Sequence, residues 1–274
     1  MNPADLADLV REQLGTWSLR ADGAPQHGTA TVVVPVRTDD GDAAVLKLGV
    51  PRPDTEHAHL VLRRWGGHGA VRLLRADPHR NAVLLERADG PDLTSLPDHR
   101  ACEVVAGLYG RLHVPAMPQL DSLTTDLERW IGDFEQLPRG APIPHRLVDQ
   151  ASTLARDLVA APQEREVVLH GDLHYGNVLA ADRQPWLAIS PRPVNGDRHF
   201  ELAPMLWHRW DELAGNVRDG LRHRFYTLVD AAGLDEDLGR AWTLVRVVHR
   251  AVREVADGAT ELTRYVAIAK AVQD

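Results

Sequence analysis

One stretch of the sequence decides the fold: Val168-Leu169-His170-Gly171-Asp172-Leu173-His174-Tyr175-Gly176-Asn177-Val178-Leu179. Its centre is polar and rich in His and Gly, whereas its ends are apolar. Two short runs typical of strands, 167–169 and 186–189, bracket this centre. Loops at strand ends carry binding and catalytic residues more often than the strands themselves do. The stretch therefore predicts a functional loop between two strands.

Asp172 and Asn177 are five residues apart. This is the spacing of a phosphotransfer catalytic loop, in which the Asp accepts the proton of the attacking hydroxyl and the Asn holds a magnesium ion. A lone Asp–Asn pair arises by chance in many proteins, but the whole string with its flanking strands is specific. His170 either orients the loop backbone or is a solvated loop histidine. A second metal-binding carboxylate is expected after the next strand, where this chain has Ser190.

The composition is that of an ordinary soluble protein, with 44% hydrophobic and 26% charged residues among 274. The net charge of −8 argues against a nucleic-acid partner. No window is apolar enough to span a membrane, and the N-terminus lacks a signal-peptide pattern. The single cysteine, Cys102, excludes an intramolecular disulfide. We therefore expect a cytoplasmic protein that binds a small molecule, with no nucleic acid or membrane as partner.

The chain changes character near residues 87–93, which carry turn residues and predict a hinge. Before them we expect a small antiparallel sheet with strands at 30–36, 43–48, 70–74 and 82–86, and one helix from about 54 to 65. After them we expect helices at 97–113, 120–137, 145–160 and several beyond 201. The predicted class is α+β, with lobes 1–88 and 89–274.

Residues 168–179 and the following Pro185-Trp186-Leu187-Ala188-Ile189 closely resemble the aminoglycoside phosphotransferase family, in its streptomycin and hydroxyurea phosphotransferase branch. Residues 69–74, 84–87 and Gly196-Asp197 also look like that branch, so the resemblance covers most of the chain. It implies a two-lobed protein-kinase-like fold, with a small antiparallel-sheet N-terminal lobe and a mostly helical C-terminal lobe. It also implies ATP between the lobes, Mg2+ on its phosphates, and a small-molecule hydroxyl as acceptor.

The resemblance also implies roles for single residues. Lys47 matches the strand lysine that contacts the nucleotide phosphates, and backbone groups near Glu86 and Ala88 would hydrogen-bond adenine. Asp172 matches the catalytic base, with His170 beside it, and Asn177 a metal ligand. Residues 24–29 are a loose candidate for a loop that covers the phosphates.

Two positions depart from the family pattern. Ser190 stands where the family has a metal-chelating Asp, and a neutral hydroxyl is a far weaker ligand for Mg2+ than a carboxylate. Asp197 is a candidate replacement, with a structural or substrate-related role as the alternative. Ala58 stands where we expect the glutamate that pairs with Lys47. Glu56 is two residues earlier and points to a different helix face.

Glu201, Trp207 and Asp211 belong to a predicted helical region and are candidates for contact with a cationic acceptor. The alternative is a solvated helix face. The 14 histidines show no spacing typical of a zinc site.

Three functional hypotheses follow. The first is an active ATP-dependent phosphotransferase that modifies a small hydroxylated compound, either cationic or neutral. The second is a member of the same family that binds a nucleotide or small molecule without phosphotransfer. The third is an enzyme that uses Asp172 and His170 for acid–base chemistry on another substrate without ATP. Whether the chain is an enzyme depends on how Ser190 and Ala58 affect the nucleotide site.

Overall fold

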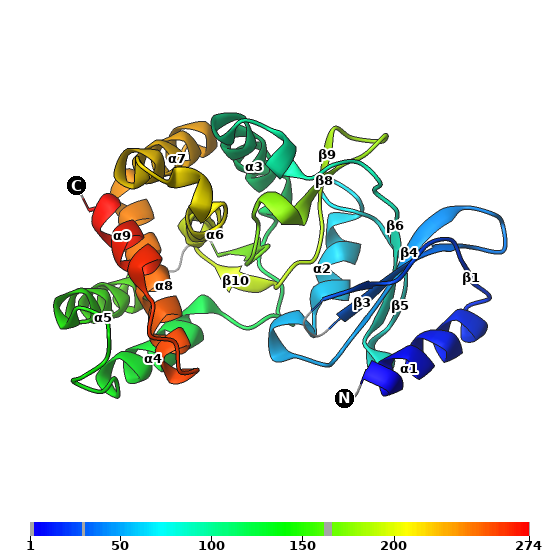
Figure 1. Cartoon of the computed structure of the whole chain (residues 1–274), viewed down its shortest axis with the longest axis horizontal. Helices are drawn as coiled ribbons and strands as arrows, with labels where there is room; N and C mark the ends of the chain where they lie inside the picture. The colour runs from blue at the N-terminus through cyan, green and yellow to red at the C-terminus, as the bar shows by residue number, and fades with distance from the viewer. Residues whose placement is uncertain (1–2, 29–30, 162–165, 274) are drawn as a thin grey trace. The chain divides into compact units, whose positions relative to one another are not determined.

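The computed structural model describes residues 3–28, 31–161 and 166–273. Within it the chain forms two compact units, both visible in Figure 1. Unit 1 comprises Met1–Gly90 and Leu179–Pro193, and unit 2 comprises Pro91–Val178 and Val194–Asp274. The lobes predicted from sequence, 1–88 and 89–274, place the segment 179–193 in the second lobe, whereas its contacts place it in unit 1.

Unit 1 is built on an antiparallel sheet in the order β1-β3-β4-β6-β5, with β2 also paired to β3. Its strands are β1 (Arg20–Ala21), β2 (Gln26–His27), β3 (Thr31–Arg37), β4 (Ala43–Gly49), β5 (Leu73–Asp77) and β6 (Ala82–Glu86). Short 3-10 turns occupy Pro53–Thr55 and Pro78–Arg80. The predicted strand at 82–86 has the observed bounds, and the one at 43–48 ends one residue before β4 does. The predicted strand at 30–36 ends one residue before β3 does, and its residue 30 lies outside the described residues.

Alternation along the two central strands creates one buried face of this sheet. The residues that point into it are Val32, Val34 and Val36 of β3 and Ala44, Leu46 and Leu48 of β4. Helix α1 (Pro3–Thr16) was not predicted from the sequence. It covers this face with Val10 and the partly buried Leu6, Leu9 and Leu14. Because side chains alternate along a strand, Lys47 lies on the opposite face from Leu46 and Leu48.

Helix α2 (Ala58–Trp65) is shorter than the predicted helix, because the chain first forms the 3-10 turn Pro53–Thr55. It buries Val61, Leu62 and Trp65 and ends at Gly66, which has the left-handed φ of 58° that favours glycine. The remaining strands near this unit are β8 (Val178–Ala180) and β9 (Trp186–Ala188), which pair with each other.

The predicted strand at 70–74 is displaced, since β5 begins only at Leu73. The residues before it pair with β9 instead: Ala70 forms a parallel bridge with Ala188, and Val71 N donates to Ala188 O over 3.0 Å. A partner more than a hundred residues away in sequence therefore takes the first part of the predicted strand.

Unit 2 is mostly helical, and the predicted helix at 145–160 has the observed bounds. Its helices are α3 (Asp98–Leu112), α4 (Leu123–Glu135), α5 (His145–Ala160), α6 (Ala203–Trp207), α7 (Val217–Ala232), α8 (Glu236–Ala256) and α9 (Thr263–Ala271). Short 3-10 turns occupy Leu93–Ser95, Tyr175–Asn177, Arg198–Leu202 and Trp210–Leu213. Helix α3 packs on α7, α4 on α5, and α8 on both α5 and α9. The predicted α+β, protein-kinase-like class is confirmed by the fold comparisons described below.

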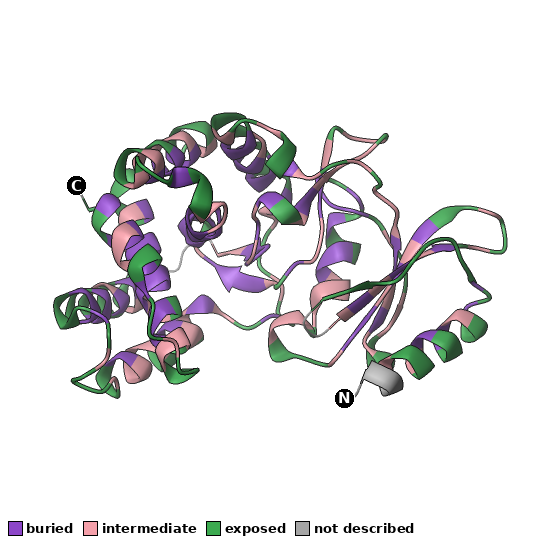
Figure 2. Ribbon diagram, viewed as in Figure 1, coloured by how far each residue is buried: buried purple, intermediate pink, exposed green. Residues whose placement is uncertain are grey.

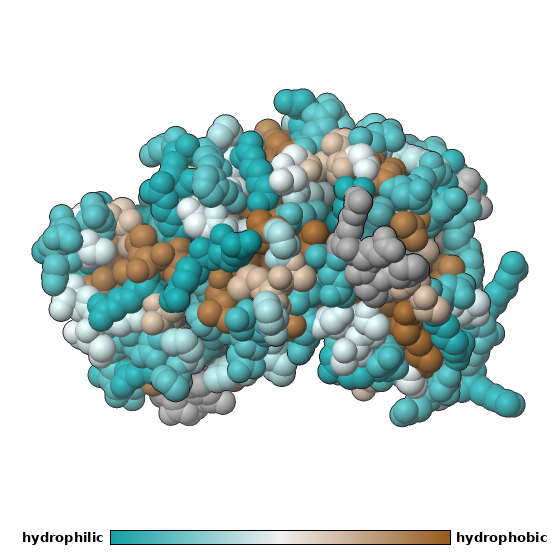
Figure 3. Space-filling view, turned by 180° about the vertical axis from the view of Figure 1, so that it is seen from behind, coloured by the Kyte–Doolittle hydropathy of each residue, from teal (hydrophilic) through white to brown (hydrophobic). Residues whose placement is uncertain are grey.

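Within unit 2, β7 (Val167–Leu169) pairs antiparallel with β10 (Val194–Gly196). All three residues of β10 are buried, as the purple arrow in Figure 2 shows. This pair holds the start of the polar loop that follows Leu169. On the face seen in Figure 3, hydrophilic side chains surround separate apolar patches. None of the helices in the described residues is long and apolar enough to cross a bilayer.

Candidate functional site

The polar loop after β7 is closed by its own hydrogen bonds. Asn177 Nδ2 donates to Asp172 O over 2.8 Å, and Asn177 N donates to His174 O over 2.9 Å. Gly171 has a φ of 78°, a conformation that a residue with a Cβ rarely adopts. The structure therefore brings the predicted pair Asp172 and Asn177 together, with Asp172 half-buried.

His170 lies beneath this loop and has no exposed surface. Its Nδ1 accepts a hydrogen bond from Asp172 N over 3.3 Å. Of the two interpretations of His170, this placement matches a residue that orients the loop backbone and not a solvated histidine.

Glu201 holds the same loop from the other side. Its Oε1 accepts hydrogen bonds from the backbone amides of His170 and Gly171. Arg246 donates to Gly171 O and, over 2.7 Å, to Phe200 O, and Tyr109 donates to Glu201 O over 2.9 Å. Burial raises the pKa of Glu201 to about 7 and lowers that of Arg246 to about 10. A buried network therefore fixes the loop that carries Asp172.

The expectation that Glu201 faces a cationic acceptor does not match this placement, because the side chain has no exposed surface. Trp207 is also mostly buried, with the guanidinium of Arg246 5.2 Å and that of Arg250 5.8 Å from its ring centre. Only Asp211, in the 3-10 turn Trp210–Leu213, is exposed. The apolar residues that flank Glu201, namely Phe200, Leu202 and Ala203, were the sequence signal that this segment is buried.

Asp197 caps the 3-10 turn Arg198–Leu202. Its Oδ1 accepts from His199 N over 2.8 Å and contacts His199 Nδ1 at 2.5 Å. Burial raises the pKa of Asp197, but the hydrogen bonds from His199 outweigh it and the net shift is downward. The carboxylate thus has a local structural partner, in agreement with the structural alternative for Asp197.

Lys47 lies on β4 of unit 1, between Val33 of β3 and Val83 of β6. Its Nζ donates a hydrogen bond to Ser190 Oγ over 3.0 Å. Burial lowers the pKa of Lys47, and repulsion from the nearby Arg192 lowers it further. The structure therefore joins the predicted phosphate lysine to the serine at the metal position.

Ser190 is held in place by β9 and its partner segment. Ala188 N donates to Gly69 O over 2.8 Å, which anchors the end of β9 two residues before Ser190. Ser190 has a φ of 56°, in the left-handed region where Asp and Asn are the better tolerated non-glycine residues. Mg2+ prefers anionic oxygen ligands, and an ammonium group already donates to this neutral hydroxyl. Ser190 therefore does not fit a magnesium ligand.

The second departure from the family pattern is also visible. Ala58 is the first residue of α2, whereas Glu56 precedes the helix and its carbonyl contacts His59 Nδ1 at 3.1 Å. Glu56 thus lies outside α2 and not, as expected, on another face of the same helix.

Glu86 and Ala88 lie at and just beyond the end of β6. The Glu86 carboxylate accepts two hydrogen bonds from Arg183, both over 2.8 Å, and one from Arg72 N over 2.9 Å. The hydrogen bond from Arg183 is the main reason that the pKa of Glu86 is lowered. Ala88 is half-buried. The side chain of Glu86 therefore braces unit 1. Its backbone nitrogen donates to Arg72 O over 2.9 Å, so neither of these groups is free for the predicted adenine contact. Of the candidate loop 24–29, residue 29 lies outside the described residues.

A cluster around Asp172 was not predicted from the sequence. Ligand atoms of Asp172, His174 and His208 lie within 4.8 Å of one another. The two imidazoles stack with centres 3.6 Å apart, and His174 Nδ1 accepts from Gly176 N over 3.2 Å. Burial, then His174, lowers the pKa of His208 to about 4. Nitrogen donors of this kind suit zinc better than magnesium. Asp172 and His174 are two residues apart, but His208 lies 34 residues beyond His174, so no local spacing reveals the cluster.

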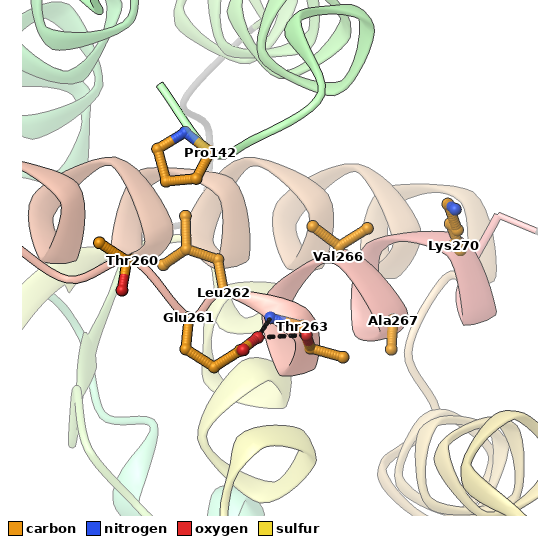
Figure 4. Close-up of a pocket in the computed structure, with 8 residues that line it drawn as sticks. All are labelled: Pro142, Thr260, Glu261, Leu262, Thr263, Val266, Ala267 and Lys270. Carbon is orange, nitrogen blue, oxygen red and sulfur yellow. Dashed lines mark hydrogen bonds between the residues drawn. The ribbon is translucent and has the colours of Figure 1, made fainter. Parts of the chain in front are cut away.

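A separate open pocket of about 350 Å3 lies in unit 2, beside α9 (Figure 4). Its lining residues are Pro142, Thr260, Glu261, Leu262, Thr263, Val266, Ala267 and Lys270. The Glu261 carboxylate accepts from Thr263 N over 3.2 Å, so its acidic group is bound locally. None of the residues predicted to form a site lines this pocket.

An antiparallel-sheet unit with a central strand lysine and a helical unit with an Asp–Asn loop define a protein-kinase-like phosphotransferase fold. A crystal structure of an aminoglycoside phosphotransferase matches with a TM-score of 0.67 at 15% identity, over 97% of this chain and 99% of that one. Choline kinase from Streptococcus pneumoniae matches with a TM-score of 0.61 at 13% identity, over 98% and 99%.

The sequence comparisons are more specific than these fold matches. The chain belongs to the aminoglycoside/hydroxyurea antibiotic resistance kinase family, whose model matches residues 16–258. Streptomycin 6-kinase from Streptomyces glaucescens is 42% identical over 94% of this chain and 86% of its own length. Hydroxyurea phosphotransferase from Kitasatospora aureofaciens is 40% identical over 97% and 78%. The family resemblance read from the sequence is confirmed.

Proposed function

We propose that this chain is an ATP-dependent phosphotransferase that phosphorylates a hydroxyl group of a small molecule. The observation that carries the proposal is the placement of Asp172. Its loop is closed by Asn177, supported by His170 and held through its backbone amides by Glu201. A base held this rigidly is what phosphotransfer needs, because catalysis there is mostly positioning and charge stabilisation.

In the proposed reaction the acceptor oxygen attacks the γ-phosphorus of ATP. The bond from that phosphorus to the β-bridging oxygen breaks, and ADP leaves with the bond's electron pair. The hydroxyl proton passes to the Asp172 carboxylate and then to solvent. Lys47 would contact the phosphates, and backbone groups near Glu86 and Ala88 would hydrogen-bond adenine.

The family resemblance implies Mg2+, and the residues fit it only in part. Asn177 has a neutral amide oxygen, Oδ1, of the type that hard cations accept. Ser190 accepts a hydrogen bond from the Lys47 ammonium and supplies no negative charge. Asp197 is bonded to His199. Because the residues fit Mg2+ only in part, the proposed reaction assigns no step to a metal ion.

The acceptor class follows from the named relatives. We propose a small polar compound with a reactive hydroxyl, of the type represented by streptomycin or hydroxyurea. The net charge of −8 is compatible with a cationic acceptor such as streptomycin. Asp211 is the one exposed carboxylate among the three residues proposed for acceptor contact, and Glu201 and Trp207 would act only by shaping the surroundings.

The test is a turnover assay with ATP and each of the two acceptors, in which ADP is measured and the phosphorylated product is identified by mass spectrometry. We expect Asp172→Asn to lower kcat on the order of 100-fold or more, because a general base is lost. Asp211→Asn, at an exposed position, should change KM more than kcat. Equal kcat for Asp172→Asn and the unmodified chain would contradict the assignment of the base.

The contact between Lys47 and Ser190 favours a second candidate, a protein that binds nucleotide without phosphotransfer. It predicts ATP binding in a calorimetric titration and no ADP release with either acceptor. Turnover of an acceptor without ATP would instead indicate acid–base chemistry at Asp172 and His170.

A further inference from the structure

We propose that Lys47, Ser190 and Arg192 form a phosphate-binding site in unit 1 that holds the polyphosphate of a nucleotide without a divalent cation. The proposal rests on the proposed function for the choice of ATP as ligand. It follows from a mismatch between the residues present and the magnesium that the family resemblance implies.

Ser190 occupies the position of the metal-binding carboxylate. In place of a carboxylate it offers a hydroxyl, whose oxygen accepts a hydrogen bond from Lys47 Nζ over 3.0 Å. A divalent cation on that oxygen would lie beside a positive ammonium group and be repelled by it. The same hydroxyl can turn its own proton toward a phosphate oxygen, because Ser is both donor and acceptor. This position is therefore suited to an anion and unsuited to a cation.

Positively charged side chains lie near Ser190. Arg192 lies near enough to Lys47 for the two positive groups to repel each other. Arg192 Nη1 is 3.5 Å from Asp54 Oδ2, but the Asp54 carboxylate is shared with Arg52, whose Nε is 3.0 Å from Asp54 Oδ1. Two arginines thus share one carboxylate, and Lys47 near Arg192 adds a further positive charge. This excess of positive charge is what an anionic ligand would neutralise.

The anion that suits these two cations is a di- or triphosphate. In phosphotransfer proteins the metal ion neutralises charge on the β- and γ-phosphates. Here a lysine and an arginine can do so, and the planar guanidinium of Arg192 can bind two phosphate oxygens at once. Arg192 is partly exposed, so it can reorient toward a ligand. A di- or triphosphate matches two separated cations better than a single phosphate does.

The experiment is a calorimetric titration of the full chain with ATP, once in EDTA and once in excess Mg2+. We expect the two Kd values to agree within about 3-fold, and inorganic tripolyphosphate to compete with ATP. Arg192→Gln should weaken binding in EDTA about 10-fold, as expected for loss of a charge-assisted contact of roughly 1.4 kcal/mol. Arg11→Gln, an exposed position on α1, is the matched control and should leave Kd unchanged.

Ser190→Asp is the decisive variant. Its left-handed backbone tolerates Asp, so the variant should fold, which a thermal melt would verify. The new carboxylate should pair with Lys47 and repel phosphate, making ATP binding at least 10-fold weaker in EDTA and restoring it with Mg2+. Equal Kd values for this variant in the two conditions would overturn the proposal.

The outcomes separate this proposal from the proposed function. Binding by the unmodified chain only in Mg2+ would overturn the metal-independent site and leave phosphotransfer standing. Binding in EDTA without turnover of any acceptor would support the site and overturn phosphotransfer. No ATP binding in either condition would overturn both.

Discussion

The Oε1 atom of Glu201 accepts a hydrogen bond from the backbone nitrogen of Gly171 over 3.2 Å, and from that of His170 as well. One buried carboxylate thereby fixes the start of the loop that carries Asp172. Arg246, which donates to Gly171 O, supplies the positive charge that makes this burial tolerable. The proposed base is therefore positioned by residues that do not themselves need to contact a substrate.

Replacing Glu201 should destabilise unit 2. Glu201→Ala would remove the main compensating charge of the buried Arg246, leaving the weaker attraction of Asp172, and would leave two backbone amides without their acceptor. We expect a loss of about 3–5 kcal/mol in the free energy of unfolding, measured by urea denaturation. Glu201→Gln keeps an acceptor oxygen and should cost less. Glu103→Gln, in an exposed pair with Arg100, is the control and should change stability by less than about 1 kcal/mol. Equal effects of Glu201→Ala and the control would refute this role.

Arg183 should stabilise unit 1 through Glu86. Besides the two hydrogen bonds to that carboxylate, its Nη1 donates to Gly67 O over 2.7 Å. Both side chains are largely shielded, with 23% and 18% exposure. We expect Arg183→Ala to lower the free energy of unfolding by about 1–3 kcal/mol, as for loss of a charged hydrogen-bond donor. Arg156→Ala removes a pair that is more than half exposed and should have a much smaller effect.

His113 should make stability depend on pH. Burial, followed by repulsion from Arg198, lowers the pKa of His113 from 6.5 to about 4. The unfolded chain therefore binds its proton at higher pH than the folded chain does. The neutral histidine costs nothing above pH 6.5, and stability is lost as pH falls from 6.5 to about 4. The largest loss is about 3 kcal/mol.

His113→Phe tests this, because the ring stacks on Tyr109 and, within the described residues, His113 Nε2 has no hydrogen-bond partner. The variant should match the unmodified chain near pH 7.5 and exceed its stability at pH 4.5. The nearby groups that also titrate or carry charge are Asp197, Arg198, His199 and Glu201. Glu201 contributes with the opposite sign, because its raised pKa favours folding at low pH and this contribution is lost as pH rises from 4.5 to about 7. It is present in both proteins, so parallel stability curves would contradict the role of His113.

Local patterns predicted much of this fold, and long-range contacts explain the rest. The strand at 82–86 and the helix at 145–160 follow from residue spacing alone, so their bounds were predictable. The pairing of Ala70 with Ala188 and the hydrogen bond from Lys47 to Ser190 join distant segments, and no local pattern encodes them. Asp172 and Asn177 could be predicted because the loop that joins them is short.

Other features of the site could not be predicted from the sequence, because they depend on which side chains the fold buries and brings together. Glu201 carries a charge and was assigned to a surface, whereas its apolar neighbours place it in the core. His208 lies 36 residues from Asp172 in sequence, and only the fold brings its ring against His174. The position of Ser190 was predictable, but its hydrogen bond with the Lys47 ammonium was not.

Gly196 should be required for packing in β10. A Cβ at this position would lie 2.4 Å from Leu123 Cδ1, 2.7 Å from its Cγ and 2.9 Å from its Cβ. These atoms include the base of the Leu123 side chain, so a change of rotamer alone does not relieve the clash, and β10 or α4 must shift. We expect Gly196→Ala to cost about 1–3 kcal/mol in the free energy of unfolding, as for other overpacked interiors. The matched control is Gly140→Ala, where a Cβ meets no atom within 4 Å. Because β10 pairs with β7 and β7 leads into the Asp172 loop, the same variant should also lower kcat. An unchanged urea midpoint for Gly196→Ala relative to Gly140→Ala would show that β10 tolerates the shift.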